Sequence, residues 1–473
     1  MCKSPPLESF AQEICSSAKI IDAYCLSAGL PYPTFDPGAP SITLPSNAPT
    51  NILEARQKLI ASAFKIQQLA TEPSEFVPRL AIHFQSFACI HWLCHFRILS
   101  FLPLEGSVPY SELATIASVP LTQLKRISRM AILSNFLQEP KPNELAHSNV
   151  SALLVTNPGL LDWALFMAEA TATGAAKLVE ATERWGTTEA KNQTAFNIAR
   201  DTELPFFDYL AQTPELRKKF AMYMKNVTVS EGTKIDHLVN GFDWASLGEA
   251  TVVDVGGSNC HASLSLATTF PQLRLIVQDL PDTIALAQNT LSSAPTSVRN
   301  RITCQAHNFF TVEPVVGANI YLLRMILHDW ADEESISILQ NLLPALVANP
   351  SSRLLIMDTV LPVPSDNEDP IDEAMLRVRD LTMMEAFNSR ERELADWERL
   401  LDEAGKTEQE GLGVKFVLVG MKKPFGSMMS VLEVAVVSTN NGIGAAETQF
   451  VNGGGAKDMS NGEMGTGNGR NLD

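Results

Sequence analysis

The sequence predicts an α/β fold in which a mostly parallel sheet follows a helical region and ends in an antiparallel hairpin. Short apolar runs such as TVVDV and IYLLRMIL alternate with helical segments such as SISILQNLLPALV. Apolar strands separated by helices are typical of a parallel sheet covered on both faces. The last two runs, GVKFVLVGM and SMMSVLEVAVVS, are separated only by KKPFG, which is too short for a helical crossover.

The N-terminal part of the chain divides into two regions. Residues 26–50 are dense in proline, glycine and serine, so we expect residues 1–50 to be a flexible segment, with order beginning at Asn51 as a helix N-cap. Residues 51–156 then have a helical periodicity. Their most apolar window, residues 81–102, contains three histidines, a glutamine and an arginine. This composition disfavours a membrane span and favours a buried or dimer-forming helix.

Residues 110–148 indicate a short helix, a turn, a longer helix and a small polar hairpin, an order typical of a winged helix. A role in reading DNA would need a basic face on the longer helix. That helix offers only Lys125, Arg126 and Arg129, in a chain with a formal net charge of −17. We therefore expect this region to pack or dimerise, and the charge disfavours nucleic acid and anionic membranes as partners.

The ends of the chain and its cysteines indicate the compartment. The N-terminus lacks the basic start and apolar stretch of a secretory signal, and the seven cysteines form no C-x-x-C pair. Both features favour a reducing, cytoplasmic location.

Residues 157–438 contain a mostly helical stretch and then the sheet. Residues 439–473 are rich in glycine and asparagine and are predicted to be disordered.

A glycine turn follows the first strand of the predicted sheet. In VVDVGGSNCHASLSLA, Asp254 lies in the strand and Gly256 and Gly257 form the turn into a helix, where a ligand is able to approach the backbone. A plain tight connection is the alternative. Asp279 ends the next strand, 25 residues after Asp254, where an acid can accept hydrogen bonds from ribose hydroxyls. The G-x-G-x-x-G pattern is absent, which argues against NAD.

A histidine and an acid follow a later strand. His328 and Asp329 come directly after IYLLRMIL. Ligands of such sheets bind at the carboxyl ends of the strands, so this pair is predicted to face the ligand crevice. The alternative is that His328 only orients the helix that begins near Asp332.

Several motifs together resemble a known family. VVDVGG, VQDLP, NFF, LRMILHDW, LLIMDTVLP and SRERELADW occur in an order and at spacings similar to those of the caffeate-type O-methyltransferases, most of all the fungal secondary-metabolite branch. The resemblance covers about residues 51–438. It implies a Rossmann-like seven-stranded methyltransferase sheet with substrate-binding helices in residues 157–438, S-adenosyl-L-methionine as cofactor, and a homodimer formed through the winged-helix domain.

The resemblance also implies roles for single residues. His328 would take the proton of the hydroxyl of a small aromatic or polyketide-like acceptor, and Asp358 and Glu391 would flank its imidazole. For the two acids, ordinary surface carboxylates are the alternative. No metal is implied. Cofactor binding is implied for Asp254, Gly256, Gly257, Asp279, Asn308, Phe309 and Arg324.

The base is not strong enough to act alone. A phenol has a pKa near 10 and an imidazole a pKa near 6.5, a difference of about 3.5 units. Proton transfer from the phenol to the imidazole is therefore unfavourable by roughly 4.8 kcal/mol. Holding the reacting atoms in line supplies on the order of 7–11 kcal/mol, so positioning is expected to matter more than basicity. The acceptor pocket is expected at Met375, Met383, Met384 and Phe387 together with the helices of residues 157–245, although plain core packing is equally consistent with these residues.

Two positions depart from the family pattern. Cys260 stands where the family usually has a small residue, and Asn308 stands where it usually has an acid, so cofactor affinity is expected to be weakened. We expect Cys260 to be a packing adjustment and not a nucleophile. The departures also motivate an alternative activity: a cyclase or pericyclase on the same fold, in which Arg324, His328 and the polar groups of TVSEGTK polarise a substrate carbonyl without methyl transfer. The intact His328 favours methyl transfer over this alternative and over a non-catalytic binding protein.

Overall fold

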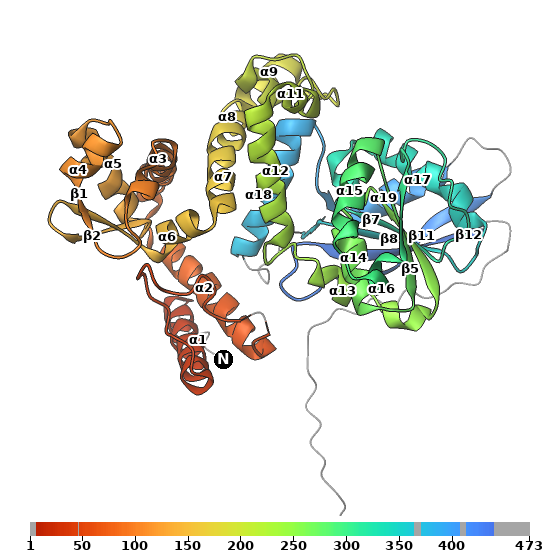
Figure 1. Ribbon diagram of the computed structural model, residues 1–473, viewed down its shortest axis with the longest axis horizontal. Coiled ribbons are helices and arrows are strands. Elements are labelled where there is room, and N and C mark those ends of the chain that lie inside the picture. The colour runs from red at the N-terminus through yellow and green to blue at the C-terminus, as the bar shows by residue number, and fades with distance from the viewer. Residues whose placement is uncertain (1–5, 46, 364–369, 407–412, 439–473) are drawn as a thin grey trace, which may run out of the picture.

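A computed structural model describes residues 6–45, 47–363, 370–406 and 413–438. The predicted disordered tail, residues 439–473, lies outside the described residues. The chain forms a helical N-terminal part, a central group of helices and a C-terminal α/β part, in that order (Figure 1).

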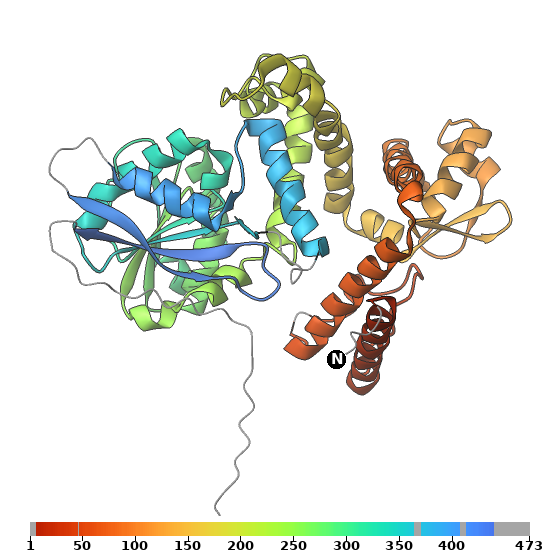
Figure 2. The same ribbon diagram turned by 180° about the vertical axis from the view of Figure 1, so that it is seen from behind.

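The chain begins with two long helices that pack side by side, α1 (Pro6–Ala28) and α2 (Thr50–Ala70) (Figures 1 and 2). The expectation of a flexible segment over residues 1–50 is therefore wrong for residues 6–28. Ser17, Ile21 and Cys25 recur every fourth residue, which places them on one buried face of α1. The prediction gave weight only to the proline-rich stretch after this helix. Asn51 is not the N-cap of α2, because the helix already begins at Thr50.

The next region contains the helix–turn–helix–hairpin order expected from the sequence. Helix α3 (Phe76–His95) is followed by two shorter helices and a small antiparallel sheet of strand order β1-β3-β2 around a separate apolar core. These elements are α4 (Tyr110–Ile116), α5 (Leu121–Ile132), β1 (Val108–Pro109), β2 (Leu137–Lys141) and β3 (Glu144–His147). Short one-turn helices flank α3 at Pro73–Glu75 (η1) and Ile98–Phe101 (η2).

A group of helices then links this region to the α/β part. These helices are α6 (Asn149–Thr156), α7 (Pro158–Phe166), the π-helical turn η3 (Met167–Thr171), α8 (Ala172–Ala175), α9 (Leu178–Trp185), α10 (Ala195–Arg200), α11 (Phe206–Gln212), α12 (Pro214–Val229), α13 (Asp236–Gly241) and η4 (Trp244–Leu247). No single helix of the described chain is long and apolar enough to cross a membrane. One pair passes such a test by length and composition only, and it is bent by 102°.

A seven-stranded sheet with strand order β11-β12-β8-β7-β4-β5-β6 forms the C-terminal part. Five strands are parallel: β4 (Ala250–Val255), β5 (Leu273–Asp279), β6 (Ile302–Ala306), β7 (Ile320–Arg324) and β8 (Arg353–Asp358). The predicted closing hairpin is confirmed as β11 (Val414–Lys422) and β12 (Ser430–Ser438), which pair antiparallel.

Helices cover both faces of this sheet, as predicted. One face packs on α13, α14 (His261–Thr269), α15 (Pro281–Ser292) and α16 (Thr296–Arg299). The other face packs on α17 (Asp332–Val347) and α19 (Leu394–Gly405). Helix α18 (Pro370–Phe387) leaves the sheet and lies beside α12 in the central group of helices (Figure 1). The short strands β9 (Val360–Leu361) and β10 (Arg392–Glu393) pair in parallel where α18 returns to the sheet.

Candidate active site

The predicted site residues gather at the carboxyl edge of the parallel sheet. Asp279, Arg324 and Asp358 are the last residues of β5, β7 and β8. After Arg324 the chain turns sharply, because Met325 has a positive φ of 55°, and it then enters the 3-10 turn η5 (Leu327–Asp329). This turn brings His328 above the end of its own strand.

Two buried side chains hold the turn that carries His328. The hydroxyl of Ser389 donates a 2.7 Å hydrogen bond to the backbone carbonyl of His328. The guanidinium of Arg392 has no exposed surface and donates to the carbonyls of Leu327 and Trp330 at 2.8 and 3.0 Å. Both residues belong to the SRERE motif. The backbone position of the imidazole is therefore fixed from two sides.

The imidazole of His328 is oriented by Glu391, which comes from the same motif. Its Nδ1 atom lies 3.0 Å from Oε1 of Glu391, and that oxygen also accepts a 2.5 Å hydrogen bond from Nε of Arg379. When Nδ1–H donates to Glu391, the lone pair of Nε2 is left free. Nε2 lies 3.6 Å from Oδ1 of Asp329, and both residues line the main pocket.

This cluster changes the protonation of its members. Burial lowers the pKa of His328, but three neighbouring carboxylates, those of Asp329, Glu391 and Asp358, outweigh burial and raise it to about 9. Burial raises the pKa of Glu391, but the cations of His328 and Arg379 outweigh burial and lower it to about 2. At neutral pH the imidazole is therefore mostly protonated and Glu391 is ionised.

Asp358 lies near the imidazole without a hydrogen bond to it. Its carboxylate comes within 4.8 Å of the ligand atoms of His328 and Glu391, yet neither of its oxygens has a hydrogen-bond partner in the described chain. Burial raises the pKa of Asp358 to about 6. Of the two acids predicted to flank His328, Glu391 contacts the ring and Asp358 acts on it through its charge.

The glycine turn after β4 leaves no space for side chains. Gly256 has a φ of +74°, and a Cβ atom there would lie 2.6 Å from Cδ1 of Ile326. A Cβ atom on Gly257 would lie 2.7 Å from Cγ of Asp254. Asp254 is buried and accepts a 2.7 Å hydrogen bond from Ser263, and burial raises its pKa to about 6. Asp254 therefore packs directly against the glycine turn.

Asp279 and Arg324 stand on either side of this turn. Asp279 accepts hydrogen bonds from the backbone N–H groups of Ser258 and Leu280 at 3.0 and 2.8 Å, which fixes its carboxylate and leaves further lone pairs for ribose hydroxyls. Arg324 donates to the carbonyl of Thr233 at 2.8 Å, and its buried Nε–H group has no partner in the described chain. The backbone cradle, the fixed acid and the unused cationic donor fit a nucleoside with a charged tail.

The two departures from the family pattern do not obstruct this edge of the sheet. Cys260 is completely buried, and its thiol points to the carbonyl of Ala287 in the core beneath α15. Burial raises the pKa of this thiol to about 12. Asn308 is exposed, and its side-chain oxygen accepts a hydrogen bond from the N–H of Phe310. The neighbouring Phe309 lies 3.6 Å from a Cβ atom placed on Gly256.

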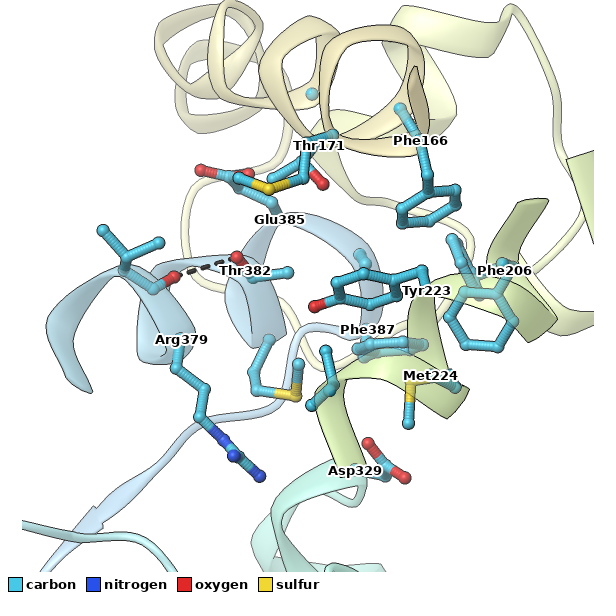
Figure 3. Close-up of a pocket in the computed structure, with 18 of the residues that line it drawn as sticks. Phe166, Thr171, Phe206, Tyr223, Met224, Asp329, Arg379, Thr382, Glu385 and Phe387 are labelled. Atoms are coloured by element: carbon cyan, nitrogen blue, oxygen red, sulfur yellow. Dashed lines mark hydrogen bonds between the residues drawn. The ribbon is translucent and has the colours of Figure 1, made fainter. Parts of the chain in front are cut away.

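A pocket of about 400 Å³ opens next to His328 between the sheet and the central helices. Its wall is mainly apolar and aromatic, with residues from α7, α11, α12 and α18 (Figure 3). Met375, Met383 and Phe387 line it as predicted. The prediction for Met384 is wrong, because this residue does not line the pocket and is 42% exposed. The sequence reasoning also missed Arg379, for which the only signal is its place on the helix before SRERE.

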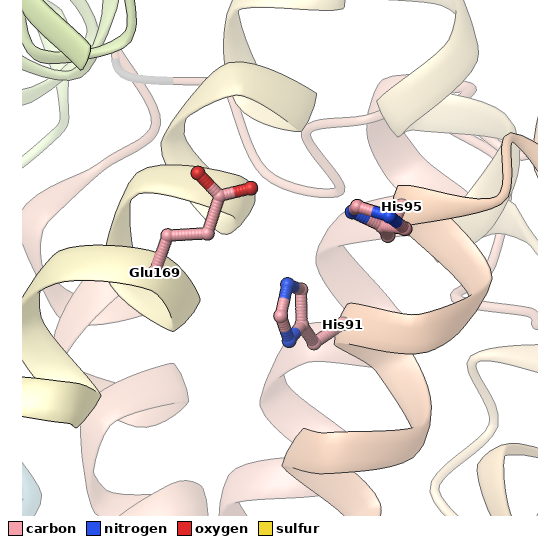
Figure 4. A group of neighbouring side chains, drawn as sticks. All are labelled: His91, His95 and Glu169. Carbon is pink, nitrogen blue, oxygen red and sulfur yellow. The ribbon is translucent and has the colours of Figure 1, made fainter. Parts of the chain in front are cut away.

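A second group with potential metal ligands lies away from this pocket. His91 and His95 on α3 and Glu169 on η3 have ligand atoms within 4.8 Å of one another (Figure 4). Lys219 already forms a 2.6 Å ion pair with the carboxylate of Glu169. Because this ammonium group competes directly with a metal ion, we assign no metal to the group.

The chain is similar to known proteins over most of its length. Residues 185–407 match the family described as O-methyltransferase domain, and residues 5–71 match the N-terminal domain of the trypacidin cluster transcriptional coactivator tpcD. The O-methyltransferase VdtC of Byssochlamys spectabilis is 51% identical over 437 residues, which cover 91% of this chain and 98% of VdtC.

Solved structures share the fold. OxaC in complex with sinefungin and meleagrin has a TM-score of 0.68 and 20% identity, covering 92% of this chain and 100% of OxaC. LepI in complex with SAM has a TM-score of 0.64 and 22% identity, covering 90% of this chain and 100% of LepI. A structure described as a pericyclic reaction enzyme has a TM-score of 0.65 and 22% identity, with the same coverage.

The match to the O-methyltransferase domain and the fold shared with structures that contain SAM or SAH identify an enzyme that uses S-adenosylmethionine as cofactor. The chain belongs to the O-methyltransferase family, and its relatives place it among the fungal secondary-metabolite enzymes.

Proposed function

We propose that the enzyme transfers a methyl group to a hydroxyl of a small aromatic acceptor, with His328 as the general base. The observation that carries this proposal is the 3.0 Å pairing of Nδ1 with Glu391, because it leaves Nε2 as the one ring nitrogen available on the pocket side. The aromatic wall of the pocket supports a flat acceptor.

The residues of the site divide the work of one transfer. Asp279, Arg324 and the backbone of Gly256 and Gly257 would hold S-adenosylmethionine, which supplies a methyl group on a positively charged sulfur. Nε2 of His328 takes the hydroxyl proton as the acceptor oxygen forms its bond to the methyl carbon. The bound cofactor would supply the methyl group and leave as S-adenosylhomocysteine, and the acceptor would leave as its methyl ether.

The raised pKa of His328 changes the energetics of the proton transfer. The pKa of this base, about 9, is only about one unit below that of a phenol, near 10, whereas an ordinary imidazole lies about 3.5 units below it. Proton transfer from the phenol then costs about 1.4 kcal/mol. The cost is that only about one molecule in a hundred has the neutral base at pH 7. Asp358, Asp329 and Glu391 stabilise the imidazolium once it forms.

The test is a transfer assay with the purified enzyme, S-adenosylmethionine and a panel of hydroxylated fused-ring aromatics, followed by mass spectrometry. We expect S-adenosylhomocysteine and a methyl ether in equal amounts, and a loss of roughly 10²–10⁴-fold in kcat for His328→Ala. Calorimetry should give an unchanged Kd for S-adenosylmethionine in this variant. Full activity of His328→Ala would end the assignment of the base.

The same assay separates the cyclase alternative, because a cyclisation would yield product without S-adenosylhomocysteine. Its residues have less support. Lys234 forms an ion pair with Glu231, and neither Lys234 nor Arg324 lines the pocket. Ser230 and Thr233 of TVSEGTK do line it, but their hydroxyls hydrogen-bond to each other at 2.9 Å. Methyl transfer is therefore the function that the site favours.

We further propose that the N-terminal region is a winged-helix module that forms a homodimer. The first two-thirds of α3 expose large apolar side chains, among them Phe76, Val77, Leu80 and Phe84. Light scattering after size exclusion should give a dimer for the wild type and a monomer for the double variant L80E/F84E. A monomeric wild type would contradict this proposal. The cytoplasmic location expected from the sequence stays a prediction.

A further inference from the structure

The pocket contains a carboxyl group that the proposed reaction does not use. Glu385 lies on α18, lines the pocket and is only 6% exposed. No described residue hydrogen-bonds or pairs with it, and burial alone raises its pKa to about 7. A buried carboxyl group without a partner is unfavourable, so its place in the wall of a cavity points to a ligand group that hydrogen-bonds to it.

Glu385 and the catalytic cluster occupy opposite ends of the pocket. Figure 3 shows Glu385 and Thr171 at one end and Arg379 and Asp329 at the other. Glu385 comes six residues after Arg379 on the same helix, which separates them by about 9 Å along the axis at 1.5 Å per residue. This separation is close to the length of a fused bicyclic or tricyclic ring system.

Aromatic side chains line the pocket between these two ends. Phe166 and Tyr223 stack with ring centroids 4.9 Å apart, and Phe207 and Phe387 stack at 5.4 Å. All four residues line the pocket. The rings of Phe166, Phe207 and Phe387 offer neither a donor nor an acceptor in their plane, so they cannot fix which way round a flat acceptor binds. The polar groups along the pocket, among them the hydroxyl of Tyr223 and the carboxyl group of Glu385, have to do so.

We propose that Glu385 is a specificity-determining residue that accepts a hydrogen bond from a second hydroxyl or N–H group of the acceptor, remote from the hydroxyl that is methylated. The preferred substrates are then fused-ring aromatics with hydrogen-bond donors at both ends. This inference rests on the proposed function for the methylated hydroxyl, but it adds a recognition site at the far end and decides the regiochemistry.

The test compares acceptors that differ only in the remote donor. Naphthalene-2,6-diol and anthracene-2,6-diol are each measured against their monomethyl ethers, with rates corrected for the two equivalent hydroxyls of a diol. A hydrogen bond to a buried carboxylate raises affinity by roughly 10–100-fold, so the kcat/KM of the wild type should be at least about tenfold higher for a diol than for its ether. In Glu385→Leu the ratio should fall to within about twofold of one, while Glu385→Gln, which keeps an acceptor oxygen, should retain part of the preference.

Thr382→Val is the matched control on the same helix. Thr382 also lines the pocket, but its hydroxyl already donates to the carbonyl of Val378 at 2.8 Å, so removal of this hydroxyl should leave the diol-to-ether ratio unchanged. Thermal unfolding of each variant shows that it is folded. A ratio that stays the same in Glu385→Leu, or a wild type that does not distinguish diol from ether, overturns the proposal.

Calorimetric binding of the same acceptors in the presence of S-adenosylhomocysteine separates this proposal from the proposed function. If the wild type binds the diol more tightly, Glu385→Leu loses that preference and no acceptor is methylated, recognition by Glu385 stands and methyl transfer fails. If methylation proceeds and Glu385→Leu keeps the wild-type preference, methyl transfer stands and the role of Glu385 fails.

Discussion

Nδ1 of His328 lies 3.0 Å from Oε1 of Glu391, and the two residues are 63 positions apart in the sequence. This contact joins the turn after β7 to the loop after α18. It orients the imidazole, supplies much of the charge that raises its pKa, and leaves Nε2 for the substrate.

The pH dependence of the reaction should report the raised pKa of His328. The base must be neutral to accept a proton, so kcat/KM for a phenolic acceptor should rise with pH and level off above an apparent pKa near 9. The carboxylate of Asp329 contributes to this shift, and its removal favours the neutral ring. In Asp329→Asn the rise should therefore occur at lower pH. A wild-type profile already level at pH 7, or a rise at higher pH in the variant, would contradict this electrostatic account.

Removing the charge of Glu391 should destabilise the protein most at neutral pH. Glu391→Gln leaves the buried cations of His328 and Arg379 without their shared anion, a loss on the order of 3 kcal/mol in the free energy of unfolding. His328 has a pKa of about 9 in the folded protein and an ordinary pKa of 6.5, so its part of this stabilisation is complete below pH 6.5 and is lost as the pH rises through 9.

Chemical denaturation at pH 7 and pH 10 measures this difference. The effect of Glu391→Gln should be smaller at pH 10, where only Arg379 still needs the anion. Glu398→Gln on the exposed side of α19 is the matched control and should change stability by less than about 0.5 kcal/mol at both pH values. Equal losses in the two variants would show that Glu391 is not a buried ion-pair partner.

The glycine turn should tolerate no side chain at position 257. In Gly257→Ala the new Cβ atom would lie 2.7 Å from Cγ of Asp254 and 2.9 Å from Cγ1 of Val277, both in the packed sheet. Relief of this overlap requires movement of the turn, with an expected loss of about 1–3 kcal/mol in stability. Calorimetry should also show weaker binding of S-adenosylmethionine. Gly38→Ala is the matched control, because Gly38 is exposed, has no positive φ, and has no described atom within 4 Å of the new Cβ. Unchanged cofactor affinity in Gly257→Ala would separate this turn from the cofactor site.

The thiol of Cys260 should not react with thiol reagents in the folded protein. Its thiol is completely buried and burial raises its pKa to about 12, so almost no thiolate forms at pH 8. Treatment with iodoacetamide followed by peptide mapping should label the exposed Cys15 and leave Cys260 unmodified. Cys260→Ala should keep kcat within about twofold of the wild type, because the thiol faces the core beneath α15. Labelling of Cys260 in the folded protein would place it in the crevice after all.

Local patterns were sufficient for most of the fold. The alternation of apolar runs and helical segments predicted the parallel strands, the helices on both faces and the closing hairpin, because periodicity and connection length are properties of short stretches. The same approach failed for α1, where a proline-rich stretch that follows the helix was extended over the helix itself. It also misplaced Met384, since a helical period does not reveal which of two half-buried faces meets a cavity.

By itself, the sequence determined that His328 and Asp279 follow parallel strands and so share one edge of the sheet. Only the tertiary structure decided that Arg379 reaches Glu391 and that Cys260 turns into the core. It also decided that Glu385 lies at the far end of the pocket with no partner among the described residues. The physical reason is that strand order fixes where each strand ends, whereas the partner of a side chain depends on how α18 packs against the central helices and η5. That packing is set by many weak contacts between residues distant in sequence, and no short stretch encodes it.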